Sequence, residues 1–412
     1  MRTAVDSLQH VREEAAARFE SLGYPTPRME AWRYTNVAPI AKTGWKEAGV
    51  SHTFDASATF GARASAELVF INGHLVQTKD ATVRGLSVLP LRTAPHEAID
   101  GVLGRVADFR DNAFVALNTA NFRDGVVITI DAGVAVPEFV HILHVGEGNG
   151  VWSHPRTVVI ANRASQVTVV ETFVGRGRYF TNAVTEVVAR EGAIVDHYKI
   201  QCESVEAFHI GTVSFRQERS SSVVSRNVSV GGALVRNDVT AALAGEGATL
   251  TLDGLFITTG SQHVDNHTLV DHLSPHCESH ELYKGVLDQN SRGIFDGRII
   301  VRPGAQKTVS RQENRNLLLS ETAIADSKPT LEIHNDDVKC NHGSTIGQLE
   351  EEPMFYLRSR GIGEQEARNL LIYAFAGEIV DRMKIEPVRE QVRRALFRQM
   401  PDRLPERRET GR

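Results

Sequence analysis

Residues 156–189 read RTVVIANRASQVTVVETFVGRGRYFTNAVTEVVA, and this stretch decides the fold. It holds three short runs rich in Val and Thr, separated by Gly or charged turn residues, which is the pattern of β-strands. GVVITI at 125–130 is a fourth run of this kind. Four turn pairs extend the pattern and begin at intervals of 29, 55 and 57 residues: Arg163-Ala164, Gly192-Ala193, Gly247-Ala248 and Gly304-Ala305. The last two intervals are near twice 28, so the sequence predicts a coil that repeats about every 28 residues.

This repeat favours one of two β folds. A β-sandwich also shows strands at regular spacing, but a single sandwich of roughly 220 residues would be large. A parallel β-helix explains the length and the period together, because each turn buries its apolar face on the next. The open ends of such a coil need caps of other structure. We therefore predict a mainly β protein with a parallel β-helix core, flanked by N-terminal and C-terminal helical regions.

Apolar spacing predicts the flanking helices. Residues 5–22 carry apolar side chains three and four positions apart, and Gly23 ends the run. Residues 364–380 repeat this spacing, and Pro387 and Pro401 bracket a third helix. The predicted division is a helical and mixed cap at 1–105, the β-helix core at 106–345 and a helical C-terminal region at 346–412.

Charge and cysteine content exclude several classes of protein. The net charge of −5 provides no positive field for a phosphate backbone, so nucleic acid is not expected as a partner. The three cysteines form no CxxC pair, and the first residues do not read as a secretory leader, so a reducing, cytoplasmic location is predicted. No window approaches the roughly 18 apolar residues that cross a bilayer, so no membrane partner is expected.

Motifs for nucleotide binding and hydrolysis are absent from the sequence: there is no GxxxxGK[ST], GxGxxG, GxSxG or HExxH. The stretch SQHVDNHTLVDHLSPHCESHE at 261–281 does contain side chains that bind transition metals, namely His263, His267, His272, His276, Cys277 and His280. Their spacing matches no standard metal motif, and alternate residues of a strand would form a polar ladder along the coil. A structural role is therefore favoured over a bound metal.

A second cluster, DDVKCNHGSTIG at 336–347, brings Lys339, Cys340 and His342 together. Cys340 and His342 share a face if the segment is extended, and a thiolate and an imidazole are good ligands for iron. The ammonium group of Lys339 would favour the thiolate and make Cys340 more reactive. The alternative is a buried thiol beside a hydrogen-bonded histidine.

Longer stretches resemble a known family. LYKGVLDQNSRGIFDGRIIVRPGAQKTVSRQENRNLLLSETA at 282–323, KPTLEIHNDDVKCNHGSTIGQLEEEPMFYLRSRGI at 328–362 and MEAWRYTN at 29–36 closely resemble the SufB/SufD family of the SUF iron–sulfur cluster assembly machinery. The resemblance implies a right-handed parallel β-helix and a scaffold subunit that is not an enzyme. Its implied partners are a SufB subunit and the SufC ATPase. Gly343 follows His342, which is the form of the SufD branch of the family.

The resemblance also implies roles for individual residues. His342 is the expected ligand of a transient iron–sulfur cluster at the SufB–SufD interface, and Cys340 is a weaker second candidate. No cofactor is expected to stay tightly bound to the lone chain. SufC is expected to contact the segment that contains Phe355, Tyr356, Arg358 and Arg360.

Three alternatives remain at this point. The chain fits a SufB-like paralogue or a homodimeric metal carrier that uses the histidine-rich stretch. It also fits a β-helix enzyme acting on carbohydrates, although the sequence offers little for that class. In isolation, a homodimer through an exposed strand edge is expected to compete with the heterocomplex.

Overall fold

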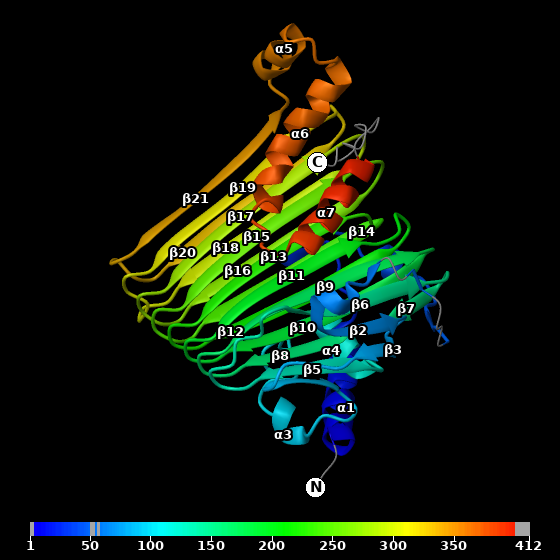
Figure 1. Cartoon of the computed structure of the whole chain (residues 1–412), viewed down its shortest axis with the longest axis vertical. Helices are drawn as coiled ribbons and strands as arrows, with labels where there is room; N and C mark the ends of the chain where they lie inside the picture. Colours follow the sequence, from blue (N-terminus) through cyan, green and yellow to red (C-terminus); the bar gives the residue numbers. More distant parts are fainter. Residues whose placement is uncertain (1–3, 50–53, 56–57, 400–412) are drawn as a thin grey trace.

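The computed structural model describes residues 4–49, 54–55 and 58–399, and strands that run side by side make up most of it (Figure 1). The strands form two sheets, and successive strands of the coil alternate between them. One sheet has the order β20-β18-β16-β14-β12-β10-β8-β5-β4, with β7 and β1 beside it, and the other has the order β21-β19-β17-β15-β13-β11-β9-β6-β2-β3. Among the described strands only β2–β3 and β4–β5 pair antiparallel. The predicted parallel β-helix is therefore confirmed, and the sandwich is excluded.

The strand bounds show how regular the coil is. The first sheet contains β1 Lys46–Glu47, β4 Leu86–Pro90, β5 Gly125–Ile130, β7 Val151–Ser153, β8 Arg156–Ala161, β10 Tyr179–Ala189, β12 Phe208–Gln217, β14 Leu234–Leu243, β16 His263–His272, β18 Arg292–Val301 and β20 Ile324–Ile333. The second contains β2 Ala64–Ile71, β3 His74–Lys79, β6 Phe139–Glu147, β9 Gln166–Arg176, β11 Ile194–Cys202, β13 Ser222–Val230, β15 Thr249–Thr258, β17 Glu278–Leu287, β19 Val309–Leu318 and β21 Lys339–Gln348. The two runs predicted at 125–130 and 156–161 are β5 and β8.

One corner of the coil is a stack of residues in the left-handed region. Ala164, Gly192, Ser220, Gly247, His276 and Lys307 all have positive φ, at spacings of 28, 28, 27, 29 and 31 residues. Each donates its backbone N–H to the next turn, as Gly192 does to the Arg219 carbonyl at 2.9 Å. The predicted pairs that start at Gly192 and Gly247 lie on this stack, whereas the pairs that start at Arg163 and Gly304 precede it by one and three residues. The sequence signal is weak because Ser, His and Lys also occupy this corner.

The interior of the coil is filled by apolar columns that run from turn to turn. One column contains Ile128, Val159, Val187, Phe215, Ala241, Val270, Ile299 and Leu331, all in parallel register. All but the last of these side chains are buried in one continuous core, and Leu331 packs against it. Each turn thus removes the apolar face of its neighbour from water, which is the main stabilising term in such a stack.

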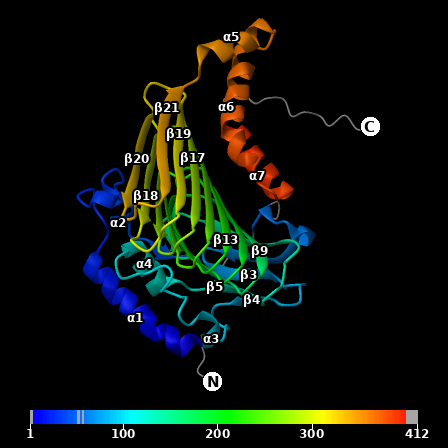
Figure 2. The same ribbon diagram turned by 90° about the vertical axis from the view of Figure 1, so that its left-hand side faces the viewer.

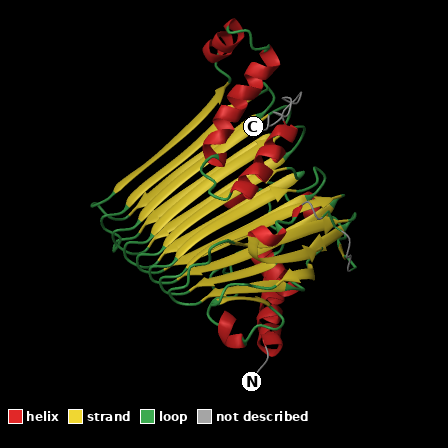
Figure 3. Cartoon of the chain, in the orientation of Figure 1, coloured by secondary structure: helices red, strands yellow, loops and turns green. Residues whose placement is uncertain are grey.

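Helices cover the outside of the coil and its first end (Figures 2 and 3). They are α1 Ala4–Leu22, η1 Glu30–Trp32, α2 Ala38–Ala41, η3 Gly61–Arg63, α3 His96–Ile99, α4 Ala113–Asn121, α5 Glu351–Ser359, α6 Glu364–Val380 and α7 Glu386–Gln399. The helices predicted before Gly23, at 364–380 and around Pro387 are therefore present. α6 and α7 bury Ile372, Ile379 and Val392 on the outer face of the ten-stranded sheet. No helix among the described residues is long and apolar enough to cross a membrane.

The division at residues 105 and 345 stays a prediction. β2, β3 and β4 lie before residue 106 and join the first ends of the two sheets, beside the helices of that region. Residues 400–412 of the predicted C-terminal region lie outside the described residues.

The MEAWRYTN segment fastens the N-terminal region to the coil. The Arg236 guanidinium on β14 lies 3.7 Å from the ring centre of Trp32 and donates to the Ala31 carbonyl at 2.8 Å. Glu30 forms an ion pair at 2.6 Å with Lys328 on β20. The segment therefore spans the outer face of the first sheet as far as its last strand.

Candidate functional site

The last turn of the coil ends in two strands that have a neighbour on one side only. β21 pairs with β19 and β20 pairs with β18, and no described strand lies beyond them (Figure 1). On β21, Lys339 donates its N–H to the Thr308 carbonyl of the preceding turn at 2.8 Å. Successive backbone groups of a strand point to opposite sides, so the free edge of β21 presents the groups of Cys340, His342, Ser344 and Ile346. This edge is an uninterrupted row of donors and acceptors.

The edge of β20 differs from that of β21. Ile324 donates to the Ser291 carbonyl at 3.0 Å, so the odd-numbered residues of β20 face the free edge. Pro329 is one of them, and proline has no N–H to donate. β20 is therefore interrupted at its centre, and β21 is the better edge for an added strand.

Cys340 and His342 lie on β21 with their side chains toward the interior of the coil. They are in register with Ser310 and Gln312, which are buried on β19. Cys340 is half-buried against the core, whereas His342 is exposed because no further turn covers it. The structure thus confirms that the two share a face and places that face at the open end.

The Cys340 thiol is not activated in this arrangement. Burial raises its pKa, and a backbone hydrogen bond from Ser310 offsets only part of that effect. The expectation that Lys339 favours the thiolate is wrong here, because Lys339 is on the opposite face of the strand. A neutral thiol becomes a metal ligand only by losing its proton when the metal binds.

Two columns of polar side chains continue inward from this pair. Below Cys340, Ser310 shares a 2.8 Å hydrogen bond with Ser279, which is 2.9 Å from Nε2 of His272. Below His342, the Gln312 amide donates to Oε2 of Glu281. The interior of the last turns is therefore polar exactly where the predicted ligands lie.

The histidine-rich stretch does not form a single site. His263 meets Thr35 on the outer face at 2.8 Å, His272 lies inside the coil, and His280 is exposed on β17. His276 and Cys277 form the corner, where the small thiol is fully buried. No group of three or more His, Cys, Asp or Glu side chains in the described part of the chain is arranged to hold a metal ion. The favoured structural role agrees with this geometry.

The residues predicted to contact SufC lie on α5 and directly after it. None of the α5 residues is buried, and the exposed fractions of Phe355 and Tyr356 are 74% and 57%. Arg358 lies 3.6 Å from Glu364, and the Arg360 guanidinium lies 5.3 Å from the ring centre of Tyr356. α5 projects beyond the coil (Figure 1), so its apolar side chains have no intramolecular reason to be there.

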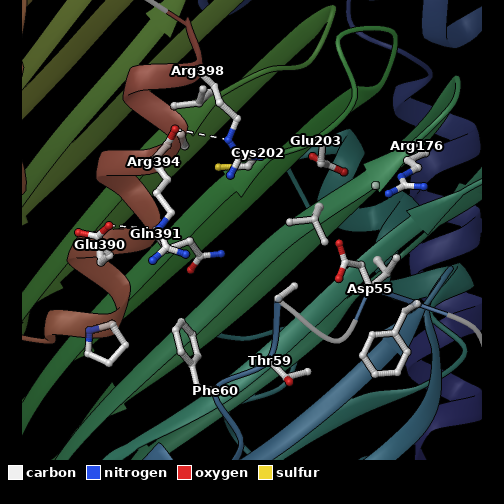
Figure 4. A pocket seen from close by; sticks show the side chains of 18 of the residues that line it. Asp55, Thr59, Phe60, Arg176, Cys202, Glu203, Glu390, Gln391, Arg394 and Arg398 are labelled. Carbon is white, nitrogen blue, oxygen red and sulfur yellow. Dashed lines mark hydrogen bonds and ion pairs between the residues drawn. The ribbon is translucent and has the colours of Figure 1, made fainter. Parts of the chain in front are cut away.

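A cleft of about 1340 Å³ lies between α7 and the outer end of the second sheet (Figure 4). Its walls include arginines and acids in near balance: Arg63, Arg176, Arg394 and Arg398 against Asp55, Glu147, Glu203, Glu386 and Glu390. Burial raises the pKa of Cys202 on its floor to about 12, so this thiol is neutral. The cleft brings together none of the predicted site residues.

Sequence reasoning missed Ser310, Gln312 and Glu281. Their signal is the repeat itself, because residues 281, 312 and 342 are spaced by 31 and 30, close to one turn of the coil. Only the register shows that they form one column.

The fold defines a parallel β-solenoid protein with helices around its first end and two unpaired strands at its last. The chain matches the family model of the SUF system FeS cluster assembly SufBD core domain over residues 144–375 and that of the SufBD N-terminal region over residues 1–142. The chain belongs to this SufBD family of iron–sulfur cluster assembly proteins.

Relatives support the assignment along most of the chain. An iron–sulfur cluster assembly SufBD family protein of Synechocystis is 32% identical over 94% of this chain and 90% of its own length. The iron–sulfur cluster assembly protein SufD of Escherichia coli is 28% identical over 92% and 90% of the two chains. The SufD protein of Bacillus subtilis is 25% identical over 93% and 92%.

Proposed function

We propose that this chain is a SufD-type scaffold subunit that pairs through the open end of its coil with a SufB-type partner. The observation that carries the proposal is the free edge of β21, which presents an uninterrupted backbone row with Cys340 and His342 directed into the open turn. Ile324, Ile333 and Ile346 add exposed apolar side chains at this end, with exposed fractions of 52%, 42% and 47%. Unpaired edges with apolar side chains pair with another chain.

The nascent cluster is held at that interface. Cys340 and His342 supply a thiol and an imidazole, and a cluster iron needs more ligands than these two. The partner chain completes the set, so the cluster forms where the two coils meet. This explains why a transient cluster, and no tightly held cofactor, is expected for the lone chain.

The energy for the process comes from a separate ATPase of the SufC type. The chain lacks a phosphate-binding loop, and α5 offers Phe355 and Tyr356 as an exposed apolar pair for docking. ATP-driven movement of α5 would be passed to the coil through α6, which packs on the second sheet. The cytoplasmic location stays a prediction.

The test is to co-express this chain with its SufB-type and SufC-type partners and to measure the mass, iron and sulfide of the purified complex. We expect a stable complex, and we expect His342→Ala to keep the complex but lower bound iron and sulfide at least about fivefold. Asn341→Ala, on the opposite face of the same strand, is the matched control. Failure to form any complex would refute the scaffold role, and normal iron and sulfide in the His342 variant would refute the ligand role alone.

A further inference from the structure

One buried carboxyl group in the described chain lacks a basic partner. All other buried carboxyl groups lie beside a basic side chain, in the pairs Glu67–His141, Asp124–Arg92, Glu171–His197, Glu186–Arg156, Asp196–Lys384, Glu203–His209, Asp253–Arg382 and Asp265–Arg236. The exception is Glu281 on β17, which is 2% exposed. Its donors are the Gln312 amide and the Thr268 hydroxyl, the latter at 3.3 Å. A buried carboxylate without a cation is strongly disfavoured, so this group is held as a neutral acid.

The surroundings of Glu281 contain no positive charge. β15 and β19 flank it with Leu252 and Gln312, and the opposite sheet contributes Thr268. The nearest titratable groups are Tyr283 and His272. Burial and then the charge of Glu281 raise the pKa of Tyr283, and burial lowers the pKa of His272 to about 4, so both are neutral near pH 7. For Glu281 itself, burial raises the pKa to about 7, and its two hydrogen bonds offset only part of this.

Glu281 is connected to the open end by a single side chain. Gln312 lies directly above it, and His342 lies above Gln312 in register. The carbonyl oxygen of Gln312 is buried and has no hydrogen-bond partner among the described residues. Gly297 on β18 leaves the space for this amide, because a Cβ there would collide with Nε2 of Gln312 and with the Phe295 ring. The column is thus built from two strands to place an amide between the acid and the exposed histidine.

We propose that Glu281 is a proton-exchanging group that balances the charge of a cation at the open end. It carries a proton while the end is empty, and it releases that proton to solvent when a divalent cation is bound beside Cys340 and His342. The carboxyl group becomes a carboxylate and no electrons move. The column therefore compensates cation charge that the neutral interior of the last turns would otherwise leave unbalanced.

The distance along the column allows this coupling. Two strand spacings of about 4.8 Å separate the layers of Glu281 and His342. A unit charge about 10 Å away, at an effective dielectric constant near 20, shifts a protonation midpoint by about one pH unit. The proposal rests on the proposed function for the identity of the cation, but the coupling itself is testable without metal.

The metal-free test uses infrared spectroscopy of the purified full chain. The carbonyl band of a protonated carboxyl group that is lost in Glu281→Gln is assigned to Glu281, and its midpoint is followed with pH. We expect a midpoint near pH 7 that falls by about one pH unit in His342→Arg. Asn341→Arg adds the same charge on the outer face of β21 and should shift the midpoint by less than about a third of that. A band already lost at pH 6, or equal shifts in the two arginine variants, would overturn the proposal.

A second measurement adds ferrous iron at pH 7 to the complex with the SufB-type and SufC-type partners. We expect the Glu281 band to disappear as iron binds and to remain when His342→Ala prevents binding. Iron that binds without changing the band would overturn this inference and leave the proposed function intact. Iron that binds equally to the His342 variant would overturn the ligand role in the proposed function, while the metal-free result would still decide the coupling.

Discussion

Glu281 and Asp265 show how a single neighbour decides the state of a buried carboxyl group. Burial opposes the charge of Asp265 as well, but Arg236 and His267 outweigh it and hold its pKa below the usual range. Glu281 has only neutral donors, so its pKa rises. The two groups therefore contribute to stability with opposite pH dependence.

For Glu281→Gln we expect a stability gain relative to wild type that grows with pH. Because the folded-state pKa is raised to about 7, the native state holds a proton that the unfolded state has lost between about pH 4.5 and 7. Wild-type stability therefore falls through this window, by about 3 kcal/mol in all, and the amide variant escapes the loss. Urea unfolding of both proteins at pH 5 and pH 8 measures the difference, and a constant difference would contradict the prediction.

Asp265→Asn should behave in the opposite way. It leaves the Arg236 guanidinium buried without its partner at 2.9 Å, which costs about 3–5 kcal/mol at pH 7. The same urea experiment tests it, and Asp271→Asn on the same strand, whose partner Arg302 is exposed, is the control with an expected loss under about 1 kcal/mol. A similar loss in both variants would argue against the buried pair.

At the scale of elements, β21 and β20 differ in what they can add. In β21 the N–H of Ser344 faces the free edge, whereas the N–H of Thr345 faces β19. Ser344→Pro should therefore leave the lone chain folded but weaken binding of the SufB-type partner at least about tenfold. Ser344→Ala is its control. Thr345→Pro should instead destabilise the lone chain, since it removes a hydrogen bond within the coil.

Analytical ultracentrifugation of the purified subunits, together with thermal unfolding of each lone chain, separates these outcomes. Unchanged partner binding by the Ser344→Pro variant would show that the partner does not pair along β21.

α5 is an element without a role inside the chain. Replacing both Phe355 and Tyr356 by Ala should change the free energy of unfolding by less than about 0.5 kcal/mol, because neither side chain is buried. Binding of the SufC-type ATPase should fall strongly, as measured by calorimetry. Leu370→Ala, an exposed apolar position on α6, is the matched control. Equal ATPase binding by all three proteins would remove α5 from the docking surface.

At the scale of the molecule, the sequence predicted the architecture better than the site. The spacing of apolar residues identified α6 with its bounds, and short Val-rich runs identified β5 and β8. These signals are local, because each strand and helix face is written in neighbouring residues.

The site depends on register, which is not local. Lys339 and Cys340 are neighbours in sequence but point to opposite faces, so the expected activation of the thiol fails. Glu281 and His342 are far apart in sequence and lie in one column. The drift of the repeat between 27 and 31 residues hides such columns until the turns are stacked.

The whole chain is thus a coil whose core is complete in every turn except the last. The central claim is that this last turn is completed by a partner and holds a cluster through His342. Electron spin echo spectroscopy of the reduced cluster tests it most directly, in a complex in which only this chain carries ¹⁵N-labelled histidine. We predict a ¹⁵N coupling to the cluster that is lost in His342→Ala and retained in His280→Ala. A cluster that is present at full content without any ¹⁵N coupling would contradict the account.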